Sequence, residues 1–394
     1  MRCLMHRCCG WVLASLLFAP IQGTTAAATE GQSASATAPS AAAMAEYRRK
    51  LEEYTAARRK YEAEADAYWS SVAEKRRLRQ AKLRKNQEIV PGDYVLAQPP
   101  IYSGPPKPVD PSAPIEAAPP KKYVPLVADF LRAAAQEFGF VPQQPRSEIE
   151  YKRAYVKVAF AAGLTKEQVV RIYAFESGGD GKYDVQAGLE QPKPGAQAIS
   201  NALGYNQLLA TNSVELMAEK GDQFIKTLSE KAAQLSEEAK ATLQKELAVL
   251  KRMISFCRSV PDSWSEHDKL ANTPKGLAIH ALNLDIDVGP LLQTQKLLDS
   301  VLFARAQGYG TVLSAAELEM MNLTGDGNGL DILRMPPGLR ERVPTSNFFQ
   351  PGGYERNPIA GRHNVVSKLL AATNAVMDQE SKLSGAKELA SLFE

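Results

Sequence analysis

A glutamate at the end of a predicted helix is the residue best placed to do chemistry. Residues 165–176 have a helical pattern, Thr165 and Gln168 fit a capping box at its start, and Gly178 follows as a stop signal. Four residues at positions i, i+3, i+4 and i+7 share one face of this helix: Val169, Ile172, Tyr173 and Glu176. The sequence therefore predicts a carboxyl group on the apolar face of a helix, in its last turn.

Such a carboxyl group is expected to keep its proton. Desolvation disfavours the charged form, and the partial negative charge at the end of a helix disfavours it further. We therefore expect the pKa of Glu176 to be raised, so that the side chain can donate a proton near neutral pH. The alternative is a partly exposed glutamate at a fraying helix end.

A second motif lies downstream, where residues 202–211 read Ala-Leu-Gly-Tyr-Asn-Gln-Leu-Leu-Ala-Thr. Together with Glu176-Ser177-Gly178, this segment resembles the soluble lytic transglycosylase family, whose domain is similar to goose-type lysozyme. The resemblance implies that Glu176 is the catalytic residue. It also implies four residues that contact the glycan or support the glutamate: Ser177, Tyr205, Asn206 and Gln207.

The resemblance further implies an activity, the cleavage of the MurNAc–GlcNAc bond of peptidoglycan glycan strands without a cofactor. Glu176 would protonate the glycosidic oxygen, and would then act as a base while the muramic acid's own hydroxyl closes an anhydro ring. A lysozyme-type hydrolase would instead need a second carboxylate about 5 to 9 Å away. Asp180 or Asp184 could supply that group from the following loop. The other alternative is a non-catalytic peptidoglycan-binding or envelope scaffold protein with a lysozyme-like domain.

Composition limits the other classes of function. The 394 residues include 47 Lys and Arg against 44 Asp and Glu, which gives no indication of nucleic-acid binding. Four histidines without an HExxH or CxxC motif predict no dedicated metal site. Residues 1–28 combine a basic start, an apolar run and a small-residue cleavage site, so they predict a signal peptide and a periplasmic or secreted protein. After cleavage we expect no membrane-spanning segment, and Cys257 would be the one remaining cysteine.

The segments before the catalytic motifs predict an extended arm. Residues 29–43 are rich in Ala, Ser and Thr and predict a flexible linker, and 91–122 form a Pro-rich linker. Between them, 44–90 predict a highly charged helix whose tyrosines recur every seven residues, at Tyr47, Tyr54, Tyr61 and Tyr68. That spacing is typical of a coiled coil or of a helix that lies on a partner. The helix ends in a run of seven basic residues at 75–85, which is either a solvated face or a site for an anionic surface. Residues 44–86 are thus the predicted contact with an envelope protein or an anionic surface.

The rest of the chain predicts an all-α, lysozyme-like domain at residues 123–379. A helical hairpin is expected as an insertion at 213–260, and 380–394 are expected to be a C-terminal tail. Ser147 and Glu150 fit a capping box that opens another helix of the domain.

Two loops remain ambiguous in the sequence. Residues 324–331 are either a fragment of a calcium loop or, more simply, a glycine-rich turn between helices. The aromatic residues at 348–354 would either stack on sugar rings or anchor a buried loop.

Overall fold

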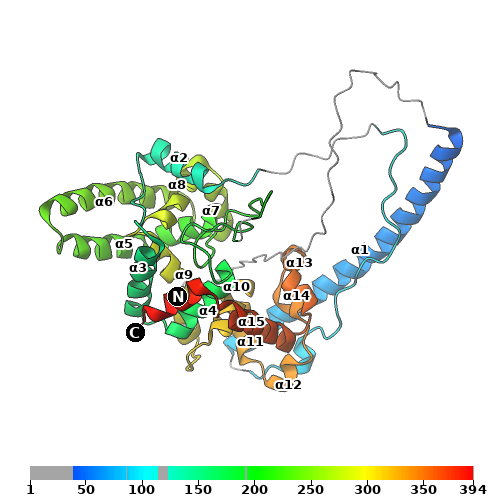
Figure 1. The fold of residues 1–394 in the computed structure, drawn as a ribbon. Coiled ribbons are helices and arrows are strands. Elements are labelled where there is room, and N and C mark those ends of the chain that lie inside the picture. Colours follow the sequence, from blue (N-terminus) through cyan, green and yellow to red (C-terminus); the bar gives the residue numbers. More distant parts are fainter. Residues whose placement is uncertain (1–38, 86, 114–122, 191–192, 394) are drawn as a thin grey trace, which may run out of the picture. The chain divides into compact units, whose positions relative to one another are not determined.

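A computed structural model describes residues 39–85, 87–113, 123–190 and 193–393. The predicted signal peptide at 1–28 and most of the predicted linker at 29–43 lie outside the described residues. The described residues form helices joined by turns, with no β-strand among them, which confirms the all-α class (Figure 1). No helix among them is both long and apolar enough to cross a lipid bilayer.

The described chain divides into two units. In its described part, unit 1 comprises residues 123–341 and 365–393, and unit 2 comprises residues 39–113 and 342–364. This division differs from the predicted domains in one main respect, because residues 342–364 belong with the N-terminal arm and not with the domain predicted at 123–379.

Unit 1 is built from helices that surround a continuous apolar core. In chain order the helices are α2 Val127–Phe138, α3 Glu148–Ala161, α4 Lys166–Ser177, α5 Ala210–Ala232, α6 Glu237–Cys257, α7 Trp264–Ala271, α8 Pro274–His280, the 3-10 helix η2 Ala281–Leu284, α9 Gly289–Ala306, α10 Ala315–Thr324, α11 Asp326–Arg334, α12 Pro337–Arg340, α15 Val366–Glu380 and α16 Ser384–Ser391. Fully buried apolar side chains of this core include Phe130, Met217, Met253, Leu282 and Leu292, which come from α2, α5, α6, η2 and α9. Their burial removes apolar surface from water, which is the main force that holds such a bundle together.

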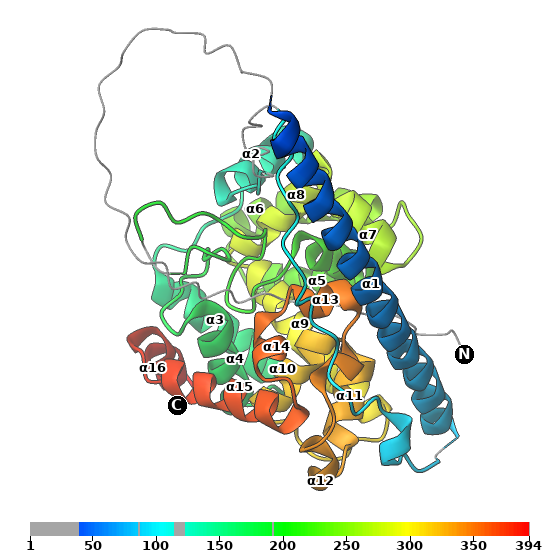
Figure 2. The same ribbon diagram turned by 90° about the vertical axis from the view of Figure 1, so that its right-hand side faces the viewer.

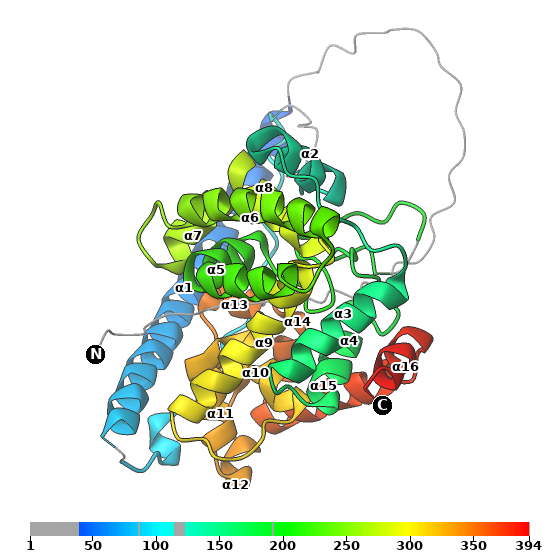
Figure 3. The ribbon, with the colours of Figure 1, turned by 90° about the vertical axis from the view of Figure 1, so that its left-hand side faces the viewer.

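Helices α5 and α6 form the predicted hairpin. They lie side by side and are joined by residues 233–236, as Figures 1 and 3 show. The helices approach closely at Gly221, where an added Cβ would lie 2.5 Å from Cγ1 of Ile254. A glycine is therefore required at this crossing.

The predicted helix starts are correct, but one predicted cap is wrong. At α4, Thr165 accepts a hydrogen bond from the Gln168 backbone, and the Gln168 side chain accepts one from the Thr165 backbone, so the capping box is present. At α3, Ser147 is the N-cap residue but its side chain makes no capping hydrogen bond. The Glu150 carboxylate accepts instead from the backbone of Arg146.

The predicted C-terminal tail contains a folded helix of unit 1. Helix α16 packs against α3 and α4, and Ala386 and Leu389 are fully buried there (Figure 2). The Lys152 ammonium, itself buried, donates to the Gly385 carbonyl at 2.9 Å and to the Glu388 carboxylate at 2.7 Å. A lysine 233 residues before Gly385 in the sequence thus helps to hold this helix, which its own eight residues could not have indicated.

Unit 2 is built on the long charged helix, which is confirmed as α1, Ala41–Arg84. Its shorter helices are η1 Pro91–Asp93, η3 Thr345–Phe348, α13 Pro351–Glu355 and α14 Pro358–Arg362. Asn347, fully buried, joins the two sequence segments of the unit. Its side chain accepts from the Val95 backbone N–H at 2.9 Å and donates to the Val95 carbonyl at 2.8 Å.

The tyrosine face of α1 is covered in part by the chain's own Pro-rich segment. The ring of Tyr102 packs edge-on against Tyr54 and Tyr61, with ring centroids 6.3 and 5.5 Å apart. The described part of the predicted linker, residues 91–113, therefore belongs to unit 2 and contacts the helix through Tyr102. The heptad spacing of the tyrosines here serves a contact within one chain.

Part of the basic run of α1 is also used inside unit 2. The guanidinium of Arg76 donates to the carbonyls of Asn347 and Phe349, and Lys82 pairs with Asp93 at 2.7 Å. Arg79 is completely buried in the same place.

Of the two alternatives for the aromatic residues at 348–354, the structure agrees with the buried anchor. Phe348 and Phe349 are buried, and Tyr354 packs against Trp69 of α1 with ring centroids 5.8 Å apart.

Candidate active site

Glu176 lies in the last turn of α4 and is almost completely buried, with 3% of its surface exposed. The helix ends directly behind it because Gly178 adopts the left-handed conformation, with φ 65°. Val169, Ile172 and Tyr173 on the same face are fully buried, as the pattern predicted. The alternative of a partly exposed glutamate at a fraying end does not apply.

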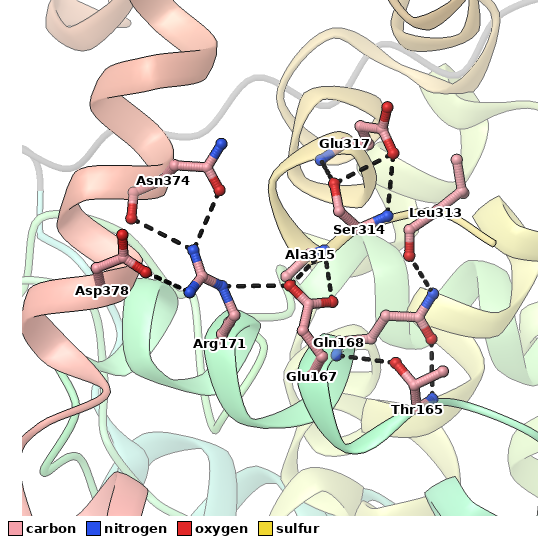
Figure 4. Close-up of polar contacts among 10 residues, drawn as sticks. All are labelled: Thr165, Glu167, Gln168, Arg171, Leu313, Ser314, Ala315, Glu317, Asn374 and Asp378. Carbon is pink, nitrogen blue, oxygen red and sulfur yellow. Dashed lines mark hydrogen bonds and ion pairs between the residues drawn. The ribbon is translucent and has the colours of Figure 1, made fainter. Parts of the chain in front are cut away.

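The first turns of α4 are tied to two other helices of unit 1 (Figure 4). The carboxylate of Glu167 accepts from the backbone N–H of Ala315 at the start of α10, and the Gln168 amide donates to the Leu313 carbonyl at 2.8 Å. Arg171 pairs with Asp378 on α15. These contacts fix α4 beside α10 and α15, and so they set where Glu176 lies.

Helix α10 supplies two polar side chains at the buried carboxyl. Asn322 Nδ2 donates to Glu176 Oε1 at 2.6 Å, and it lies 3.4 Å from each carboxyl oxygen of Glu319. Glu319 is fully buried. Because Glu319 and Asn322 are three residues apart, they lie on the same face of the helix.

Neither α10 residue was identified from the sequence. The available signal was local, since both polar residues interrupt an otherwise apolar helix that reads Leu318-Glu-Met-Met-Asn-Leu323. A buried helix with two polar positions on one face requires partners for them.

A lysine from α9 connects the two sequence motifs. Lys296 Nζ donates to the backbone carbonyl of Asn206 at 3.3 Å, and its positive charge acts on both Glu176 and Glu319. The structure therefore brings the glutamate and the backbone of the 204–207 motif to the same lysine.

The balance of these effects leaves Glu176 able to exchange a proton at neutral pH. Burial raises the pKa of Glu176 to about 7, and the nearby charge of Glu190 adds to the rise. The charge of Lys296 and the hydrogen bond from Asn322 act in the opposite direction. Burial also raises the pKa of Glu319 well above its usual range, and the charge of Glu176 raises it further.

The second motif forms a tight turn. Leu203 and Leu208 pair through two backbone hydrogen bonds of 2.9 and 3.0 Å, with residues 204–207 as the loop between them. Gly204 has φ 81°, and an added Cβ would lie 2.4 Å from Nε2 of Gln293. The loop is thus packed tightly onto α9.

The side chains predicted to contact glycan point into the protein. Tyr205 is fully buried and its hydroxyl donates to Glu148, while its ring packs against Tyr173, one turn before Glu176. The Asn206 amide donates to the Tyr155 hydroxyl and the Gln207 amide to the Val185 carbonyl.

These contacts tie the three side chains to the interior of unit 1. Ser177 is held in the same way, since its buried hydroxyl donates to the Tyr173 carbonyl at 2.7 Å.

A pocket adjoins the cluster, with a cavity volume of about 50 Å³. Asn322 and Lys296, which both lower the pKa of Glu176, are part of its wall. The other lining residues are Asn212, Glu215, Trp264, Leu297, Ser300, Leu318, Met321, Gly325 and Asp326. The pocket wall therefore combines polar and apolar groups, with one aromatic side chain.

The predicted glycine-rich turn at 324–331 is one residue long. Gly325 alone separates α10 from α11, and the positions from Asp326 onward belong to the first turns of α11. Asp326 accepts from the Ser300 hydroxyl at 2.6 Å. No group of three or more His, Cys, Asp or Glu side chains suited to a metal ion occurs within the described part of the chain.

The two loop aspartates have different surroundings from those of Glu176. Asp180 is exposed, and it accepts from the Gly385 backbone at 2.6 Å and the Ser384 hydroxyl at 2.8 Å. It thereby caps α16, and these bonds hold its pKa below the usual value. Asp184 is half-buried, and its charge acts on Glu148 and Tyr183.

Asp180→Ala is therefore expected to loosen α16 without disturbing Glu176. Loss of a helix cap costs roughly 0.5–2 kcal/mol. Hydrogen exchange of the amides at 384–391 should become faster, and Asp184→Ala, from the same loop, is the control. If α16 exchanges at the same rate in both variants, Asp180 is not its cap.

Comparisons with protein-family models, with curated proteins and with solved structures find no match for this chain.

Proposed function

We propose that this protein is an exported peptidoglycan lytic transglycosylase in which Glu176 is the single general acid and base. One observation carries the proposal. Glu176 is a buried carboxyl group at the end of α4, its pKa is raised to about 7, and it has one amide donor and one nearby ammonium. A group with a pKa near the working pH can both donate and accept a proton.

The residues around Glu176 suit both steps that the family resemblance implies. In the first step the protonated carboxyl donates to the glycosidic oxygen, and burial favours that protonated form. In the second step the carboxylate accepts the proton of the muramic acid hydroxyl. The Asn322 N–H and the Lys296 charge stabilise the carboxylate between the two steps.

The surroundings of the other carboxyl groups favour a mechanism with one glutamate over two-carboxylate hydrolysis. Asp180, one of the two predicted partners, already binds the start of α16. Glu319 is close to Glu176, and burial together with the Glu176 charge raises its pKa well above its usual range, which disfavours the carboxylate form that a nucleophile needs.

The pocket beside Asn322 and Lys296 is the place where we expect the sugar to approach. Trp264 supplies an aromatic face, and the buried side chains of Glu215 and Asp326 supply hydrogen-bond acceptors. Sugar rings are bound through this combination of aromatic and polar groups.

Mass spectrometry of the products released from purified sacculi tests the proposal. Anhydro-muramyl ends are expected. Reducing ends would identify a lysozyme-type hydrolase instead. Binding to sacculi without any soluble product would support the alternative of a non-catalytic peptidoglycan-binding or scaffold protein.

Lys296→Met is expected to extend activity to higher pH. The positive charge of Lys296 lowers the pKa of Glu176, so its removal should raise that pKa. Because the reaction starts with protonated Glu176, the alkaline limb of kcat/KM should move to higher pH. Activity on soluble glycan chains measures this limb, and Lys226→Met, an exposed site on α5, is the control. A limb that stays in place or moves to lower pH would contradict the assignment.

A further inference from the structure

Two carboxyl groups and one ammonium meet around Asn322. Glu176 comes from α4, Glu319 from α10 and Lys296 from α9, and both glutamates are buried. Glu190, in the loop that follows α4, adds a further negative charge that acts on Glu176. One ammonium compensates one buried carboxylate, whereas a second buried carboxylate would carry the full cost of desolvation.

The amide nitrogen of Asn322 lies closer to one of the two carboxyl groups than to the other. Its nitrogen is 2.6 Å from Glu176 and 3.4 Å from both oxygens of Glu319. An amide NH2 has two hydrogens, so it can face both groups, but the shorter bond favours a negative charge on Glu176. The geometry thus favours a negative charge on Glu176 over one on Glu319.

We infer that Glu319 is a positioning residue that keeps its proton while Glu176 ionises, so that Glu176 alone changes charge at this site. The order in which the two groups ionise does not depend on the proposed function. Only its use in catalysis rests on that function. A neutral Glu319 holds the Asn322 amide toward Glu176 and adds no second charge to the cluster. The electrostatic coupling between the two glutamates favours the same order of ionisation, because the charge of Glu176 raises the pKa of Glu319.

Two substitutions of Glu319 separate this role from simple packing. Glu319→Gln keeps a neutral polar group of the same shape, and Glu319→Leu removes it. We expect turnover on soluble glycan chains to fall at least about tenfold in the leucine variant, and glutamine to restore most of the loss. The pH midpoint of kcat/KM in Glu319→Gln should stay at its wild-type value. A midpoint that moves to lower pH would show that Glu319 is charged in the wild type, and would overturn the inference. A glutamine variant as slow as the leucine variant would also overturn it.

A titration without substrate gives an independent answer. The carbon-13 signals of glutamate-labelled protein are followed against pH in the wild type, Glu176→Gln and Glu319→Gln. Burial raises the pKa of Glu246 to about 8, so its signal should titrate in all three proteins. A further carboxyl should titrate near pH 7 in the wild type, persist in Glu319→Gln and disappear in Glu176→Gln. The signal of Glu319 should titrate at lower pH in Glu176→Gln, because the Glu176 charge is gone.

Loss of the neutral-range titration in Glu319→Gln, with its persistence in Glu176→Gln, would reverse the order and overturn the inference. If the protein titrates as expected but releases no product, the result would contradict the proposed function. The inferred order of ionisation would still hold.

Discussion

Glu176→Gln is expected to lower turnover on purified sacculi by at least the ~10²–10⁴-fold that general acid–base catalysis contributes. The amide is nearly isosteric with the carboxyl, so Asn322 and Lys296 keep their surroundings, but it has no proton of suitable acidity to transfer. Release of soluble muropeptides measures the effect, and Glu137→Gln, an exposed site on α2, is the control. Full activity in Glu176→Gln would contradict the assignment of Glu176 as the general acid and base.

The same variant should be more stable than the wild type in alkaline solution. The folded-state pKa of Glu176 is about 7, above the value of 4.5 for a free side chain, so the folded protein holds this proton more tightly than the unfolded chain. The contribution of this proton to the free energy of unfolding is therefore fully present below about pH 4.5. It is lost as the pH rises to 7, and the loss is up to about 3 kcal/mol. Glutamine does not ionise, so chemical denaturation at pH 8 should show a gain that is absent at pH 4. Low activity together with this gain would exclude misfolding as the cause.

Arg79→Met is expected to destabilise unit 2. The Arg79 guanidinium is buried, donates to the carbonyls of Asp93 and Asn347, and lies 4.3 Å over the ring of Tyr94. Methionine fills much of the volume but leaves the Asp93 carbonyl without this donor, at a cost of roughly 1–3 kcal/mol, while the Asn347 carbonyl keeps its hydrogen bond from Arg76. The expected result is faster hydrogen exchange in residues 342–364.

Arg77→Met on the same helix is the matched control, because Arg77 is exposed. It removes the same charge without removing a buried donor, so its effect should be within about 0.5 kcal/mol. If the two variants exchange equally fast at 342–364, Arg79 does not hold the two segments of unit 2 together.

Local pattern was sufficient for the helix that carries Glu176. The capping box at Thr165, the apolar face and the left-handed Gly178 are all present in the structure. The charged helix α1 and the hairpin of α5 and α6 were predicted by the same kind of evidence, since periodicity in one segment reports which face will be buried.

The partners of Glu176 could not be predicted in this way. Lys296, Glu319 and Asn322 lie more than one hundred residues from it in the sequence, and their pairing depends on how α9 and α10 pack beside α4. The inward direction of Tyr205 likewise follows from its bond to Glu148 on α3. A motif shows which residue types are present, but not which of them will face a cleft.

The division into units was also decided by tertiary contacts. Residues 342–364 follow the motifs at 165–178 and 202–211 in the chain, yet Asn347 pairs with Val95, and Tyr354 packs against Trp69. The sequence by itself determined α1, α4 and the hairpin of α5 and α6 and placed one carboxyl group on a buried face, because these follow from spacing within a single segment. Only the tertiary structure decided the neighbours of that carboxyl group and the segments that make up each unit, because packing, burial and charge compensation act between residues that are distant in the chain.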